Sequence, residues 1–189
     1  MMQGSPRERL RELILSTAVI RGRVTLSSGR EADYYIDLRR VTLHHEGAPL
    51  VGHIMLEQLG VAGFGPGKVD AVGGLTLGAD PIATALLHAA AARGRRLDAF
   101  VVRKDAKTHG MQRRIEGPDV EGRRVVVVED TSTTGASALT AVEALREAGA
   151  IVLAVAVIVD RDTGAREAVE AQGLPYIYVY RLAELGLES

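Results

Sequence analysis

Short apolar runs alternate with helical patterns through the middle of the chain. Residues 125–128 are four consecutive valines bounded by turn residues, which is typical of a buried strand. Leu139, Val142 and Leu145 then repeat at helical spacing as far as Gly149. The pattern therefore predicts a strand that leads directly into a helix.

The same alternation extends from residue 71 to residue 159. Further strands are predicted at residues 71–72, 99–102 and 152–159, and a helix at residues 81–92. Near-continuous apolar strands separated by helices predict an α/β fold with a parallel sheet that is covered on both faces. Ligands bind such sheets outside the carboxyl ends of the strands. The segments expected at those ends are residues 73–74, 129–130 and 160–161.

The first third of the chain has a different pattern. Leu10, Leu13 and Ile14 predict an amphipathic helix, with Ser5 as its cap and Pro6 in its first turn. Residues 24–28 and 34–38 alternate or turn like a short β-hairpin, and residues 48–59 predict a second helix before a loop at 63–67. A glycine-rich turn is expected at residues 73–78.

Composition excludes several classes of function. The 189 residues include no cysteine, so disulfides, thiolate metal sites and a thiol nucleophile are excluded, which is compatible with a cytoplasmic location. A net charge of −1 and the absence of tryptophan argue against a nucleic-acid partner. No apolar stretch of membrane-spanning length is present, and we expect neither a membrane partner nor a targeting segment.

The turn after the four valines is rich in groups that bind a sugar phosphate. It comprises Glu129, Asp130, Thr131, Ser132, Thr133, Thr134, Gly135, Ala136 and Ser137. Unpaired amides at a helix N-terminus attract an anion, and hydroxyl side chains add donors. The two carboxylates would repel a phosphate but accept hydrogen bonds from a ribose diol. The alternative interpretation is ordinary helix capping with acidic turn residues.

A basic segment without regular periodicity precedes that turn. Residues 103–117 include Arg103, Lys104, Lys107 and His109, with glycines that permit movement. A mobile flap that neutralises a polyanion such as diphosphate is one interpretation, and a solvated charged loop is the other. Phosphoribosyl diphosphate carries both a ribose 5-phosphate and a diphosphate, so it satisfies the two segments together.

Several motifs resemble those of a known family. The stretch VVVVEDTSTTGAS resembles the phosphoribosyl diphosphate signature of type I phosphoribosyltransferases, and VRKDAKTHG resembles the flexible catalytic loop of the orotate-specific branch. The similarity continues through TLSSGREADYY, GGLTLGADPIA and VDRDTGA, so it covers nearly the whole chain. It implies one domain over residues 1–189: a central parallel sheet flanked by helices, an N-terminal helix and hood region (1–45), and a mobile catalytic loop (103–117).

The resemblance also implies an activity and roles for residues. Ribose 5-phosphate would pass from phosphoribosyl diphosphate to orotate, giving orotidine 5′-phosphate and diphosphate, in pyrimidine (UMP) synthesis. Lys107 and His109 would be catalytic. The phosphoribosyl diphosphate site would comprise Arg103, Lys104, Lys107, His109, Glu129, Asp130 and residues 131–137, that is Thr131, Ser132, Thr133, Thr134, Gly135, Ala136 and Ser137. The orotate site would comprise Thr133, Arg161, Tyr35 and Ile36.

The family pattern further implies Mg²⁺ as cofactor and a homodimer whose basic loops are shared between subunits. Mg²⁺ is held mainly by substrate oxygens in such sites, so no dedicated metal ligands are expected. Two motifs depart from the family: Ser27 replaces a common lysine, and residues 75–78 replace a turn that carries a Tyr-Lys pair. Without those cations, the turn would act through backbone amides.

Thr133 bears on the choice of base. Phosphoribosyltransferases for 6-oxopurines carry aspartate at the matching position, whereas a carboxylate would repel the orotate anion. Neutral Thr133 with cationic Arg161 therefore favours orotate, although Arg161 could instead be a surface salt-bridge residue. The functional alternatives are a phosphoribosyl-diphosphate-sensing regulator of the same fold and a transferase for another base. The histidines outside the basic segment are expected to be structural or exposed, with adjacent His44 and His45 pointing apart.

Overall fold

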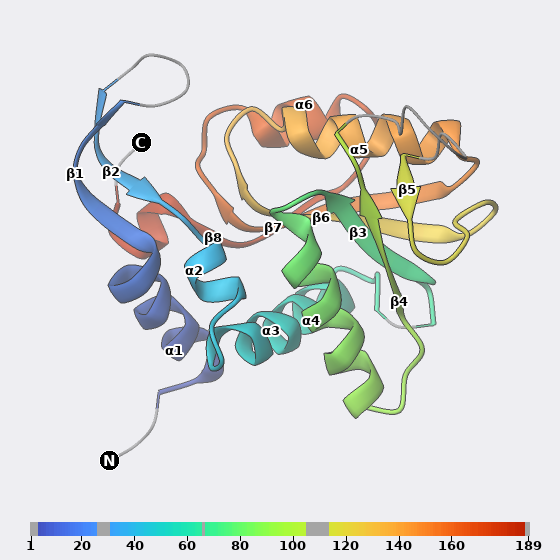
Figure 1. Ribbon diagram of the computed structural model, residues 1–189, viewed down its shortest axis with the longest axis horizontal. Helices are drawn as coiled ribbons and strands as arrows, with labels where there is room; N and C mark the ends of the chain where they lie inside the picture. Colours follow the sequence, from blue (N-terminus) through green and yellow to red (C-terminus); the bar gives the residue numbers. More distant parts are fainter. Residues whose placement is uncertain (1–3, 26–30, 66, 105–113, 188–189) are drawn as a thin grey trace.

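A central sheet carries helices on both of its faces (Figure 1). The computed structural model describes residues 4–25, 31–65, 67–104 and 114–187, with only the backbone described at 23–25 and 31–33. The sheet strands are β3 (Ala71–Leu75), β4 (Asp98–Val102), β5 (Ile115–Glu116), β6 (Arg124–Ser132), β7 (Ile151–Asp160) and β8 (Tyr176–Arg181). Their order is β5-β4-β3-β6-β7-β8, and only β5 is antiparallel to its neighbour. The predicted α/β fold with a central parallel sheet is confirmed.

The helices divide the apolar core into two layers. They are α1 (Pro6–Leu13), α2 (Arg39–Thr42), α3 (Gly47–Val61), α4 (Ala79–Ala92), α5 (Ala136–Glu147) and α6 (Ala165–Glu170). In β6, Val126 and Val128 join the core beneath α1, α3 and α4, while Val125 and Val127 join the core beneath α5 and α6. Both faces of the valine run are therefore buried, as its uninterrupted apolar character predicts. No helix within the described residues is long and apolar enough to cross a bilayer.

The N-terminal segment forms a helix and a hairpin beside the sheet. Ser5 caps α1 in a capping box with Glu8, in which the Glu8 amide donates to the Ser5 hydroxyl at 3.2 Å. The helix continues as a π-helical turn, Ile14–Ala18, and leads into the antiparallel hairpin of β1 (Val19–Thr25) and β2 (Glu31–Ile36). The predicted first helix and hairpin are confirmed, but both strands begin earlier than expected, and the predicted residues 26–28 lie outside the described residues.

Two predicted boundaries were wrong for the same reason. Gly73 and Gly74 lie in β3 and not in the turn predicted at residues 73–78. In β6 the strand continues through Glu129 to Ser132 instead of ending at Val128. Pairing with the neighbouring strands decided both boundaries, and the local composition did not reveal it.

Several elements were not predicted from the sequence, including the strand at the C-terminal end of the sheet. The strands β5 and β8, the helices α2 and α6, and the 3₁₀ turn Leu182–Leu185 are additions to the expected elements. Strand β8 widens the sheet beside β7, and the Tyr180 hydroxyl at its end donates to the Arg7 carbonyl of α1. The chain end thereby fixes the N-terminal helix against the sheet.

Close packing of α3 on α4 depends on one glycine. A Cβ atom on Gly52 would lie 2.4 Å from the Ala85 carbonyl oxygen of α4. Gly60, in the same helix, has open space at the equivalent position. Alanine substitution at Gly60 therefore measures helix propensity alone, whereas substitution at Gly52 measures helix propensity together with packing.

We expect Gly52→Ala to lower the free energy of unfolding by about 1–3 kcal/mol, because the added methyl group must push α4 away. Gly60→Ala should raise it by up to about 1 kcal/mol through helix propensity alone. Urea titration of both variants measures the difference. Equal stability of the two variants would contradict the close contact between the helices.

Candidate active site

The acidic pair lies within the last part of β6. Pairing with β3 ends at Val127, but pairing with β7 continues from Glu129 opposite Val157 to Ser132 opposite Asp160, so β7 holds the backbone of the pair. The Asp130 carboxylate accepts a hydrogen bond from the Thr131 amide at 2.6 Å, and the Glu129 side chain is only 7% exposed. Regular sheet pairing therefore fixes two carboxylates at the edge where ligands of parallel sheets bind.

Burial alters the acidity of both groups. Burial raises the pKa of Glu129 to about 8, and the neighbouring Asp130 charge adds to the effect, while Lys104 opposes it. Burial likewise raises the pKa of Asp130, although the hydrogen bonds from Thr131 lower it. Within the described residues, Glu129 Oε2 is buried without a hydrogen-bond partner. The pair is therefore suited to a ligand that brings hydrogen-bond donors or a cation.

The turn after β3 packs directly over these carboxylates. A Cβ atom on Gly78 would lie 3.0 Å from both Asp130 Oδ1 and Glu129 Oε1. The turn is anchored at Thr76, whose amide donates to the Val102 carbonyl at 2.9 Å and whose hydroxyl donates to Asp80 at 2.7 Å. The backbone at Gly78 thus borders the acidic pair.

The hydroxyl-rich segment divides between strand, loop and helix. Thr131 and Ser132 belong to β6, and Ser132 is buried. Thr133 and Thr134 are exposed in the loop, and Gly135 adopts a left-handed conformation with φ of 78° at the N-cap of α5. Ala136 and Ser137 are exposed in the first turn of that helix. The helix N-terminus therefore opens toward solvent beside the acidic pair, which suits an anion.

The loop after β7 joins the same edge of the sheet. The Arg161 amide donates to the Ser132 carbonyl at 3.0 Å, and the Thr163 hydroxyl donates to the Thr133 carbonyl at 2.7 Å. The Arg161 guanidinium lies 5.9 Å from the centre of the Tyr34 ring, which belongs to β2. The structure therefore brings the loops of Arg161 and Thr133 together and places the Arg161 guanidinium beside Tyr34 of the hairpin.

The two hairpin residues predicted to line the base pocket differ in burial. Tyr35 is 36% exposed, whereas Ile36 is 5% exposed and belongs to the core beneath the hairpin. Tyr34, which sequence reasoning did not select, is the residue that faces Arg161. Alternation along β2 was the signal that could have separated Tyr34 from its neighbours.

Only the ends of the basic segment are described. The Arg103 amide donates to the Arg114 carbonyl at 2.7 Å, and its guanidinium lies 3.6 Å from the Glu116 carboxylate. Lys104 is exposed, and its charge acts on Glu129. Lys107 and His109 lie outside the described residues, as does most of the predicted mobile loop.

A further cation borders the acidic pair and was missed by sequence reasoning. The Arg39 Nε atom lies 2.8 Å from Asp37 Oδ1, and Arg39 holds the pKa of Asp37 below its usual value. The positive charge of Arg39 also acts on Asp130. The signal available in the sequence was the pair of opposite charges, Asp37 and Arg39, at the end of the predicted hairpin.

The four described histidines lie on or between the helices α2, α3 and α4 and not in the loops that form the candidate site. His45, His53 and His88 are exposed, and His44 is half-buried, as expected. The prediction that His44 and His45 point apart was wrong, because they lie in an irregular link between α2 and α3 with ring centres 4.3 Å apart. Among the described residues there is no cluster of three or more His, Asp or Glu side chains placed to bind a metal.

Comparison with known proteins identifies the family. The sequence profile of the phosphoribosyl transferase domain matches residues 44–172. A curated orotate phosphoribosyltransferase from Streptomyces coelicolor is 64% identical over 183 residues, covering 96% of this chain and 98% of the relative. The chain belongs to the orotate phosphoribosyltransferase family. The family prediction made from the motifs is therefore confirmed.

Solved structures agree with this assignment. An orotate phosphoribosyltransferase from Mycobacterium tuberculosis H37Rv, in complex with Fe(III) dicitrate, is 59% identical with a TM-score of 0.86, covering 97% of this chain and all of the other. The same enzyme in complex with 5-phospho-α-D-ribosyl 1-diphosphate is 54% identical with a TM-score of 0.82, at the same coverage. Both the type I fold and the expected enzyme class, a pentosyltransferase of pyrimidine nucleotide synthesis, follow from family membership.

We expect Glu129 to make the free energy of unfolding depend on pH. Its folded pKa of about 8 exceeds the usual 4.5, so its contribution is fully present below about pH 4.5 and is lost as pH rises through 8. The loss has a slope of at most about 1.4 kcal/mol per pH unit. Urea titrations between pH 5 and 9 should show a shallower decline for Glu129→Gln. Parallel curves for the two proteins would contradict the raised pKa.

Proposed function

We propose that the edge of the sheet formed by β3, β6 and β7 is the active site for transfer of ribose 5-phosphate from phosphoribosyl diphosphate to orotate. One observation carries the assignment of the site. The turn at Gly78, the carboxylates of Glu129 and Asp130, and the loop of Arg161 meet at one edge, although they are far apart in sequence. Family membership supports the reaction, and this juxtaposition supports the roles of individual residues.

The ribose 5-phosphate end of the donor fits β6 and the start of α5. Glu129 and Asp130 accept hydrogen bonds from the ribose hydroxyls, and this replaces the solvent that burial has removed. The 5-phosphate binds the exposed amides and hydroxyls of the hydroxyl-rich segment, at the positive end of the α5 dipole. The segment comprises Thr131, Ser132, Thr133, Thr134, Gly135, Ala136 and Ser137.

The diphosphate end is neutralised by the basic segment. Arg103, Lys104, Lys107 and His109 bind the leaving diphosphate, and the backbone of Leu77 and Gly78 approaches it from the turn after β3. During transfer, the bond from C1′ to the diphosphate oxygen breaks, a bond from C1′ to orotate N1 forms, and the proton of orotate N1 passes to the leaving diphosphate. Positive charge develops on the sugar while negative charge collects on the leaving group. Lys107 and His109 therefore catalyse the reaction by stabilising that group and excluding water.

The orotate site lies between the loop of Arg161 and the hairpin. Arg161 pairs with the orotate carboxylate, and Thr133 contacts the ring without the repulsion that an acidic side chain would cause. Tyr34 covers the pocket from the hairpin side. Ile36 supports it from the core, and Tyr35 lies on the opposite face of β2. The 5.9 Å approach of Arg161 to Tyr34 supports this position for the base, because it encloses the cation beneath an aromatic ring.

Mg²⁺ fits this site as a companion of the substrate. The carboxylate oxygens of buried Glu129 and half-buried Asp130 are of the hard type that magnesium prefers, but two adjacent carboxylates do not form a complete set of ligands. The ion would therefore be held mainly by oxygens of the diphosphate and ribose. When bound, it neutralises part of the charge on the leaving group.

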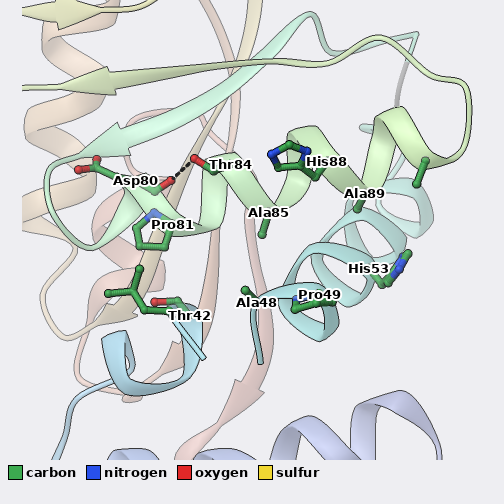
Figure 2. Close-up of a pocket in the computed structure, with 12 residues that line it drawn as sticks. Thr42, Ala48, Pro49, His53, Asp80, Pro81, Thr84, Ala85, His88 and Ala89 are labelled. Atoms are coloured by element: carbon green, nitrogen blue, oxygen red, sulfur yellow. Dashed lines mark hydrogen bonds between the residues drawn. The ribbon is translucent and has the colours of Figure 1, made fainter. Parts of the chain in front are cut away.

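A homodimer completes the proposed site. A mainly apolar groove of about 710 Å³ runs between α3 and α4, with Ala48 and Pro49 facing Ala85 and Ala89 (Figure 2). Leu43 on this groove is 71% exposed, which is unusual for a large apolar side chain. The groove extends to the first turn of α4, next to the turn at residues 76–78. A second copy seated there lies beside the crevice, where its basic segment (103–117) can reach across.

The base specificity is tested by turnover with phosphoribosyl diphosphate and Mg²⁺. We expect loss of orotate absorbance and no turnover with hypoxanthine or uracil, because only orotate carries the carboxylate that Arg161 binds. Calorimetric titration of orotidine 5′-phosphate provides a second readout. Turnover with a purine and none with orotate would contradict the proposed base.

Lys107→Ala should lower kcat by about 10²-fold or more, because one cation on the leaving group is removed. Lys68→Ala is a matched control, since Lys68 is the single lysine outside the basic segment and is exposed in a loop remote from the crevice. Stopped assays at saturating substrates measure both variants. A Lys107→Ala enzyme with wild-type kcat would remove the basic segment from the mechanism.

Subunit mixing tests the shared loop. Lys107→Ala and Asp130→Asn are each expected to be inactive, but an equal mixture should recover about a quarter of wild-type activity, because half of the dimers contain one intact site. A mixture of Glu129→Gln with Asp130→Asn should recover none, since both changes affect the same part of the site. No recovery in the first mixture, with subunit exchange verified, would place each loop in its own subunit.

A further inference from the structure

Asp162 has an uncommon backbone conformation directly after Arg161. Its φ of 53° is left-handed, and it is the one non-glycine residue with a positive φ among those the structure describes. Aspartate, asparagine and glycine tolerate this region better than other residues. The conformation turns the chain sharply between the end of β7 and α6.

Both the backbone and the side chain of Asp162 are anchored. Its amide donates to Asp160 Oδ1 at 3.1 Å, and Asp160 is only 1% exposed. Its own carboxylate lies 3.6 Å from the Nε atom of Arg181, at the end of β8. Asp160 and Arg181 are direct partners in the register of β7 and β8. The turn is therefore tied to the last paired residues of the sheet.

The Arg181 guanidinium is confined as well. Its Nε atom is buried without a hydrogen-bond partner in the described part of the chain, and its guanidinium carbon lies 5.0 Å from the centre of the Tyr178 ring. The carboxylate of Asp162 supplies the charge that balances it. Both side chains are 41% exposed, so the ion pair adds little energy by itself. It restrains the turn because the Arg181 Nε atom is buried and the Asp162 backbone is already held by Asp160.

We propose that Asp162 is a positioning residue that holds Arg161 toward the base. Asp160 and Asp162 fix the backbone before and after Arg161, and the Arg161 amide is fixed on the Ser132 carbonyl at 3.0 Å. The remaining freedom is that of the Arg161 side chain, which lies beneath Tyr34. The inference rests on the proposed role of Arg161 in binding the orotate carboxylate.

The test separates the carboxylate from the backbone of Asp162. Asp162→Asn keeps the tolerance for positive φ and removes the charge, whereas Asp162→Ala removes both. We expect the KM for orotate to rise about threefold to tenfold in Asp162→Asn and further in Asp162→Ala, with the KM for phosphoribosyl diphosphate within twofold of wild type. The unchanged KM for the donor shows that the variants are folded.

Two companion variants make the result specific. Arg166→Ala is the matched control, since Arg166 also stacks on Tyr178, at 5.2 Å, and should leave the KM for orotate within twofold of wild type. The double variant Asp162→Asn with Arg181→Gln should raise the KM for orotate no more than the single variant with the larger effect, because the residues act as a pair. Additive losses in the double variant would overturn the proposed pairing.

Arg161→Ala distinguishes this inference from the function on which it rests. We expect it to weaken orotate binding by at least about 100-fold in calorimetry, through loss of a charge-assisted pair. If Arg161→Ala loses orotate while both Asp162 variants keep the wild-type KM, the positioning role is wrong and the proposed function stands. If Arg161→Ala keeps the affinity for orotate, the proposed orotate site itself is wrong.

Discussion

The proposed site depends on the parallel pairing of β6 with β7 up to their last residues. The register continues to Ser132 opposite Asp160, and the Ser132 carbonyl then accepts the amide of Arg161. This backbone contact transfers the order of the sheet to the loop beyond it. Without this pairing, the carboxylates of β6 and the Arg161 cation after β7 would lie on loops that are positioned independently of each other. A rigid sheet thus supplies the positional accuracy that a charged site requires.

Removing two neighbouring carboxylates from solvent costs free energy, and in the protein without substrate this cost is not fully compensated. Loss of solvent raises the pKa of Glu129 and of Asp130, and the opposing charges, Lys104 at Glu129 and Arg39 at Asp130, offset this only in part. A ligand with several hydroxyl groups and a bound cation supplies what solvent no longer does. Under the proposed function, this unfavourable feature of the free protein would contribute part of the substrate affinity.

The hydrophobic pattern was sufficient to predict the fold between residues 71 and 159, because buried parallel strands and amphipathic helices have distinct periodicities. It failed where pairing with another strand outweighed local composition. Glu129 and Asp130 suggest a turn by residue type, yet their backbone continues the strand. At β8, tyrosines alternate with smaller residues at the edge of the sheet, and the pattern alone did not separate this strand from an irregular tail.

The candidate site shows a related division. Segments that carry many functional groups, such as the acidic pair and the hydroxyl-rich loop, could be predicted because their composition is unusual over a short stretch. Arg39, Tyr34 and Asp162 could not, because each matters through a neighbour distant in sequence: Asp130, Arg161 and Arg181 respectively. Such contacts require knowledge of the register of β7 and β8 and of the position of the hairpin. A motif therefore identifies the groups that act on a substrate more readily than the residues that hold those groups in place.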